Sequence, residues 1–117
     1  MSSGLVRSTN AGESWSDVII NPQDPNANAA ILTPASNNTA VVSQGDVTGR
    51  LFRTTNGGKT FALAFPSQPQ NPLQWTWIGF TTSQVGYGLS TQSPRYRVAI
   101  NQLWRTTDGG KTWGRVP

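Results

Sequence analysis

Short runs of apolar and β-branched residues alternate with turn-forming clusters along the whole chain. Ala30–Thr33 and Ala40–Ser43 flank the turn sequence ASNN, and Trp75–Phe80 and Val85–Leu89 flank the turn sequence TTSQ. Short runs bounded by Ser, Thr, Asn and Gly are typical of β-hairpins, and no segment has the period of an amphipathic helix. The pattern predicts an all-β protein made of antiparallel strands.

A third kind of segment occurs three times between these hairpins. Leu5–Trp15 reads LVRSTNAGESW, Leu51–Phe61 reads LFRTTNGGKTF, and Leu103–Trp113 reads LWRTTDGGKTW. The copies begin 46 and 52 residues apart, a period typical of one four-stranded blade of a β-propeller. Each copy predicts two strands joined by a tight turn.

The polar residues of the repeat are predicted to fix this turn. Gly109 and Gly110 tolerate positive φ, Asp108 can accept backbone N–H groups in an Asx turn, and the Thr106 hydroxyl is expected to bond across the hairpin. Asn10 and Asn56 stand where the third copy has Asp108. Because Asn is a poor substitute for a catalytic or metal-binding carboxylate, the acid is predicted to lock the turn.

The aromatic residue that ends each copy is expected to be buried at equivalent sites between sheets. These residues are Trp15, Phe61 and Trp113.

We letter the strands of a blade A to D from the centre outward. The chain is then predicted to be a single propeller segment of about two and a half blades. We expect an outer C–D hairpin at 5–20, a blade at 29–65 and a second blade at 74–117, joined by the Pro-rich stretches NPQDPNAN and PSQPQNP. Propellers need four to eight blades to close. The chain is therefore predicted to be a piece of a longer propeller, or part of an assembly with rearranged strands, and to self-associate through its open surfaces.

The repeat, Ser/Thr-x-Asp/Asn-x-Gly-x-x-Trp/Phe, resembles the Asp box, also called the BNR repeat. The matching residues are Ser8, Asn10, Gly12 and Trp15; Thr54, Asn56, Gly58 and Phe61; and Thr106, Asp108, Gly110 and Trp113. The resemblance implies a β-propeller with the box on each C–D turn, as in sialidases, xyloglucan-cleaving glycosidases and sortilin-type receptors. The segment WIGFTTSQVGYGLS, followed by the third box, is most similar to photosystem II assembly factors and their sialidase-like bacterial relatives.

Composition narrows the function further. The net charge is +4, but Arg7, Arg53 and Arg105 hold one repeated position and belong to the scaffold, so no nucleic-acid partner is predicted. The chain has no Cys and no His, which excludes disulfides and removes the commonest metal ligand and general base. No metal or cofactor is predicted.

No apolar run reaches the length of a membrane span, and MSSGLVRSTN lacks the apolar region of a signal peptide. The parent protein is expected to be extracytoplasmic or secreted, with its signal outside this chain.

Candidate ligand-binding residues lie on the face predicted for the B–C and D–A loops. Arg95, Tyr96 and Arg97 fall together in TQSPRYRVAIN and could hold a carboxylate or phosphate. The alternative is a solvated loop. Asp46 is expected on the same face together with Asp24, but nothing in the sequence fixes the two at the separation that a glycosidase needs.

Three interpretations follow. The first is a non-enzymatic propeller module that binds a protein or glycan ligand through this loop face, and that ligand is expected to be anionic. The second is a fragment of a secreted sialidase-like or xyloglucanase-like glycoside hydrolase whose catalytic residues lie elsewhere. The third is a fragment without activity of its own. The sequence favours the first, because it lacks a sialidase Phe/Tyr-Arg-Ile-Pro motif and its one Glu, Glu13, falls inside a repeat turn.

Overall fold

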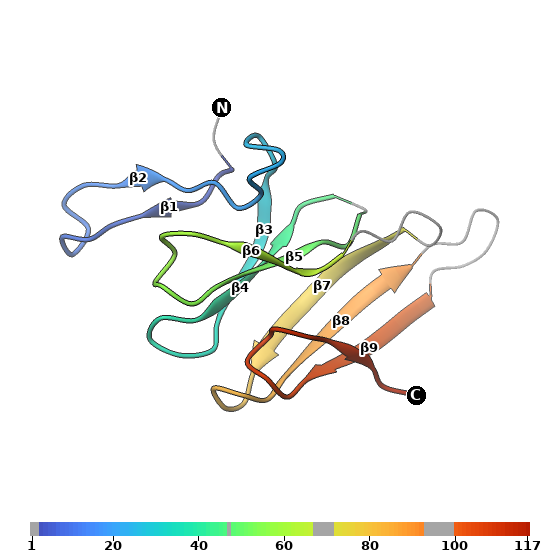
Figure 1. Ribbon diagram of the computed structural model, residues 1–117. Helices are drawn as coiled ribbons and strands as arrows, with labels where there is room; N and C mark the ends of the chain where they lie inside the picture. Colours follow the sequence, from blue (N-terminus) through green and yellow to red (C-terminus); the bar gives the residue numbers. More distant parts are fainter. Residues whose placement is uncertain (1–2, 47, 67–71, 93–99) are drawn as a thin grey trace.

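Three antiparallel β-sheets follow one another along the chain (Figure 1). The computed structural model describes residues 3–46, 48–66, 72–92 and 100–117. The first sheet contains β1 (Val6–Arg7) and β2 (Ser16–Asp17). The second contains β3 (Ala29–Pro34), β4 (Ala40–Gln44), β5 (Leu51–Thr54) and β6 (Ala62–Phe65). The third contains β7 (Leu73–Phe80), β8 (Gly86–Gln92), β9 (Ile100–Thr106) and β10 (Gly114–Arg115).

Each four-stranded sheet is a simple meander, in which every strand pairs with the next one along the chain. The prediction of an all-β chain built from antiparallel four-stranded sheets is confirmed. We call β3–β4 and β7–β8 the inner hairpins, and β1–β2, β5–β6 and β9–β10 the outer hairpins. The part of the chain that the structure describes contains no helix that could cross a membrane.

The turns of the inner and outer hairpins lie together at one end of each complete sheet. The N–H of Gly57 in the β5–β6 turn donates to the carbonyl of Asn38 in the β3–β4 turn, at 2.9 Å. The N–H of Gly109 makes the same bond to the carbonyl of Gln84, also at 2.9 Å. The loop between β4 and β5 therefore lies at the opposite end, as expected for a B–C loop.

The sheets stack face to face, with an apolar layer in each interface. One layer joins the segment that follows β2 to the second sheet through Val18, Ile20, Ala27, Val42, Phe52 and Phe61. The other joins the second and third sheets through Val41, Leu51, Phe65, Leu73, Trp75 and Ile78. Strand β4 supplies Val42 to the first layer and Val41 to the second. This explains why the run Ala40–Gln44 is nearly all buried and does not alternate between apolar and polar residues.

The repeated arginine connects each sheet to the following one. Nε of Arg7 donates to the carbonyl of Gly57 at 2.9 Å, and Nε of Arg53 donates to the carbonyl of Gly109 at 3.0 Å. Both acceptors belong to the outer turn of the next sheet. These bonds agree with a structural role for the arginines. Arg105, the third member, instead lies 6.0 Å from the ring centroid of Tyr87.

The expected burial of the three repeat aromatics is wrong for Trp15. Phe61 is buried and Trp113 is partly buried, but Trp15 is 59 % exposed. Trp113 packs against Trp75 and Phe80, with ring centroids 5.9 and 6.1 Å away. Both partners lie on β7, the inner strand of the same sheet. Trp15 is exposed because its own sheet has no inner strands among the described residues.

Candidate functional site

The three repeat turns share one hydrogen-bond pattern. In the third turn the hydroxyl of Thr106 donates to Oδ1 of Asp108 at 2.8 Å and accepts the N–H of Gly110 at 3.0 Å. Thr54 and Ser8 make the same two bonds in the other turns. The Thr106 bond therefore stays within the turn, and the expectation that it would cross the hairpin is wrong. The residues at the Gly110 position have φ near 90°, a conformation that favours glycine.

Asp and Asn fill the turn in slightly different ways. Oδ1 of Asp108 accepts the N–H of Thr112 at 2.9 Å, and Oδ2 accepts the Thr112 hydroxyl. In the second turn Oδ1 of Asn56 accepts the N–H of Thr60, while Nδ2 donates to the Thr60 hydroxyl at 2.8 Å. The Thr112 hydroxyl donates to Asp108, whereas the equivalent Thr60 hydroxyl accepts from Asn56. Asp and Asn can therefore make the same set of turn contacts. Burial of Asp108 opposes ionisation, but hydrogen bonds from Thr112 and Thr106 outweigh it and lower the pKa to about 2.

The loop between β4 and β5 contains Asp46, the acid predicted on the ligand-binding face. The N–H and hydroxyl of Thr48 donate to Oδ1 of Asp46, and Nε2 of Gln44 donates to Oδ2. Oε1 of Gln44 in turn accepts Nδ2 of the buried Asn21, at 3.2 Å. This network joins the B–C loop to the linker that follows β2. Partial burial of Asp46 acts to raise its pKa, but the hydrogen bonds of Thr48 and Gln44 and the charge of Arg50 lower it overall.

The other acids do not join Asp46 in a catalytic arrangement. Asp24 is exposed in the linker, where Oδ1 accepts the N–H of Asn26 at 3.3 Å. Glu13 and Asp108 lie in outer turns, at the opposite end of the sheets from the β4–β5 loop. No group of three or more Asp or Glu residues that could hold a metal ion is present within the described ranges. Arg95, Tyr96 and Arg97 lie outside the described residues.

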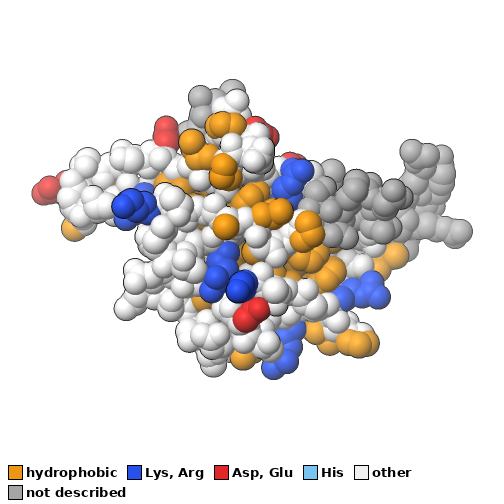
Figure 2. Space-filling model, viewed as in Figure 1, with side chains coloured by type: hydrophobic (Ala, Val, Ile, Leu, Met, Phe, Trp, Pro, Cys, Tyr) orange, Lys and Arg blue, Asp and Glu red, His pale blue; other side chains and the backbone are white. Residues whose placement is uncertain are grey.

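Surface charge on the face shown in Figure 2 is dispersed. Lys and Arg side chains appear there as separate groups around a central region of hydrophobic side chains, and they form no continuous basic stripe. This distribution lacks the basic patch that nucleic-acid-binding domains usually present.

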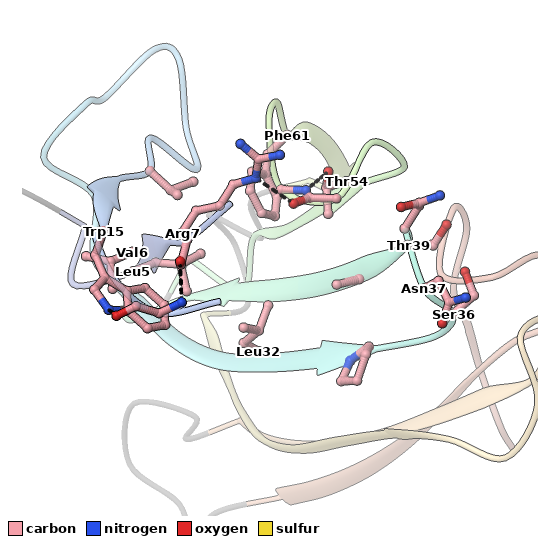
Figure 3. A pocket seen from close by; sticks show the side chains of 18 of the residues that line it. Leu5, Val6, Arg7, Trp15, Leu32, Ser36, Asn37, Thr39, Thr54 and Phe61 are labelled. Atoms are coloured by element: carbon pink, nitrogen blue, oxygen red, sulfur yellow. Dashed lines mark hydrogen bonds between the residues drawn. The ribbon is translucent and has the colours of Figure 1, made fainter. Parts of the chain in front are cut away.

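A groove that sequence reasoning missed lies between the first hairpin and the inner hairpin of the second sheet. It has a volume of about 560 Å³ and is lined mainly by apolar groups (Figure 3). Leu5, Val6 and Trp15 line it from the first hairpin, and Leu32 and Pro34 line it from β3. A second hollow of about 620 Å³ lies on the other side of the first hairpin, between β2 and the β5–β6 turn. The sequence offers one signal for this groove: the first repeat copy has no inner hairpin beside it among the described strands, so its neighbours lack that cover.

No protein-family model matches the sequence, and no curated protein matches it. Among solved structures, the chain is similar to one described as YCF48 bound to D1 peptide, with 19 % identity, a TM-score of 0.56, and coverage of 78 % of this chain and 26 % of that one. It is also similar to the GH74 xyloglucanase from Xanthomonas campestris, with 21 % identity, a TM-score of 0.68, and coverage of 94 % of this chain and 16 % of that one. The chain thus spans about a quarter and a sixth of the lengths of these two proteins. Both are β-propellers, and the likeness shows that this chain has the fold of part of a β-propeller.

Proposed function

We propose that residues 1–117 form a non-enzymatic part of a β-propeller whose B–C and D–A loops bind a protein segment. The observation that supports this most is the state of Asp46, the carboxylate on the proposed binding face. Its Oδ1 accepts from Thr48 in the loop, its Oδ2 accepts from Gln44 at the end of β4, and its pKa is lowered. The general acid of a glycosidase needs a raised pKa, so the lowered pKa excludes that role for Asp46, and an ionised nucleophile or base needs a second carboxylate, which Asp24, Glu13 and Asp108 do not supply beside it. Asp46 instead holds the loop in shape.

The similarity to YCF48, whose solved structure is of a complex with D1 peptide, favours a protein ligand over a glycan for this fold. The chain offers two guanidinium groups and a phenol in Arg95, Tyr96 and Arg97, three residues that suit an anionic segment. A peptide rich in Asp and Glu, or one ending in a free carboxylate, is therefore the proposed ligand class.

The similarity to the GH74 xyloglucanase supports a second candidate, a part of a glycoside hydrolase whose acids lie in other blades. The two candidates differ in what the isolated chain should do. A binding module retains affinity for its ligand, whereas a hydrolase fragment without its acid pair binds glycan and not peptide.

The test is selection of peptides from a random displayed library on the immobilised chain, followed by calorimetric titration of the selected sequences. We expect acidic peptides with measurable affinity. The double variant Arg95→Ala/Arg97→Ala should weaken binding by about a hundred-fold or more, because each of two charge-assisted hydrogen bonds contributes roughly 1.5–3 kcal/mol. Arg115→Ala, at an exposed arginine on β10, is the matched control and should leave affinity unchanged.

Two results would contradict the proposal. Peptide affinity that is the same in the double variant and in the control would place the binding surface elsewhere. Release of reducing sugar from xyloglucan, or of a fluorescent product from a sialoside, by the purified chain would make it an enzyme.

A further inference from the structure

The first hairpin lacks an inner turn that both complete sheets possess. In those sheets the N–H of Gly57 or Gly109 donates to a carbonyl of the inner turn, at 2.9 Å. Ala11 occupies the equivalent position in the β1–β2 turn and has the same left-handed backbone, with φ of 59°. Within the described part of the chain, the sheet to which Ala11 belongs has no inner turn. The Ala11 N–H is therefore placed for a bond that this chain does not supply.

A matched pair of side chains shows what the inner hairpin normally covers. Ile78 on β7 is 4 % exposed, since it packs in the layer that contains Val41 of β4 and Ile31 of β3. The residue equivalent to Ile78 on β3 is Leu32. It faces the first hairpin and is 51 % exposed. Leu32 therefore lacks the cover that the preceding inner hairpin gives to Ile78.

The groove coincides with the place of this missing cover. Leu32 forms part of one wall, and Val6 and Trp15 form part of the other (Figure 3). Ala11 also lines the groove. Strand β1 borders the groove and, among the described strands, pairs only with β2, so one of its edges has no neighbouring strand there. An apolar groove beside an open strand edge is suited to a β-hairpin, which can satisfy the edge and bury the apolar walls together.

We propose that this groove is the binding site of an antiparallel β-hairpin. Its second strand pairs with β1, its turn carbonyl accepts the Ala11 N–H, and its two faces cover Leu32 and Trp15. This site lies on a different surface from the loops of the proposed function, and the two can fail independently.

The hairpin comes from polypeptide outside residues 1–117. A second copy of this chain has no inner hairpin to donate, because β4 is paired with β5 and β8 is paired with β9 along their lengths. The similar structures are also much longer than this chain, which covers 16 % and 26 % of them. An additional propeller segment therefore fits the site better than a second copy does.

The absence of cysteine allows a direct test by thiol labelling. Leu32→Cys places a unique thiol in the groove, and Leu63→Cys is the matched control, because Leu63 is 54 % exposed and lies on the outer strand β6. Each variant is compared with an extended form in which an unchanged copy of residues 29–48 is joined directly ahead of Ser3. This junction keeps the spacing between the inner hairpin and β5, since Gly49 is the repeat equivalent of Ser3.

In the extended chain we expect labelling at position 32 to slow by about ten-fold or more, because the covering strands must open first. Labelling at position 63 should be unchanged, and amide exchange at Ala11 should slow. An independent arm adds residues 29–48 as a free peptide to the unextended chain, where labelling at position 32 should slow with peptide concentration.

Three outcomes would overturn the proposal. Labelling at position 32 that neither the extension nor the peptide slows would mean that the groove accepts no hairpin. Equal slowing at positions 32 and 63 would mean a general change in the fold. Slowing at position 32 with rising concentration of the unextended chain alone would make a second copy the occupant.

Discussion

Adding one methyl group at Gly110 tests whether the repeat turns pack on the preceding sheet. Gly110 has φ of 91°, and a Cβ atom there would lie 2.5 Å from Cγ2 of Val41 and 3.2 Å from Cζ of Phe80. Left-handed backbone costs a non-glycine residue roughly 1–2 kcal/mol. Overpacking a filled core costs roughly 1–3 kcal/mol more. Gly110→Ala should therefore destabilise the chain by about 2–5 kcal/mol in total.

Gly58→Ala separates the two contributions. Gly58 has φ of 88°, but a Cβ atom there would meet only the flexible side chain of Arg7, with Cδ at 3.6 Å. This variant should lose only the backbone cost of about 1–2 kcal/mol. Urea unfolding followed by circular dichroism gives both free energies. Equal losses in the two variants would refute the packing of the third turn against Val41.

Three further predictions concern the turn carboxylate, the pH dependence of stability, and assembly. Asp108→Asn should leave the free energy of unfolding nearly unchanged at pH 7, because Asn56 already makes the same turn bonds. Asp108→Ala should lower it by about 1 kcal/mol in the same urea assay. Equal losses of stability in the two variants would show that the charge itself matters. Because the pKa of Asp108 is lowered to about 2, its contribution to stability is present above pH 4 and is lost as the pH falls towards 2. Asp108→Asn should remove this part of the acid sensitivity, and an unchanged pH profile would contradict it. The chain should self-associate through the open face of the third sheet, where Trp77, Leu89 and Leu103 are exposed cross-strand neighbours. Sedimentation velocity should show concentration-dependent association, and Leu89→Lys should reduce it. A monomer at all concentrations would contradict this prediction.

The strands and turns could be predicted from the sequence because their determinants are local. In the second repeat turn, for example, each bond joins residues two or four positions apart, namely Thr54 to Asn56 and Gly58, and Asn56 to Thr60. The exposure of Trp15 could not be predicted in this way, because burial of the repeat aromatic depends on the inner strands of its own sheet. Trp113 finds Trp75 and Phe80 there, whereas Trp15 has no such partners among the described residues.

The candidate site was less accessible to sequence reasoning, because its contacts join distant segments. The predicted loop acid Asp46 does lie in the β4–β5 loop, but its role depends on Gln44, which reaches back to Asn21. The repeat pattern predicted a structural role for Arg7. It could not predict that Arg7 donates to the carbonyl of Gly57, fifty residues later in the chain. The apolar groove required knowledge of how the first hairpin sits against β3.

Amide chemical shifts in the presence of a peptide decide whether the B–C and D–A loops bind a protein segment. A peptide selected on the chain would be titrated into the ¹⁵N-labelled protein. We expect shifts at Gly45, Thr48 and Ala27 in the loops and linker, with the repeat-turn amides of Gly57 and Gly109 unchanged. Shifts confined to the repeat turns, at the opposite end of the sheets, would contradict binding through the loops.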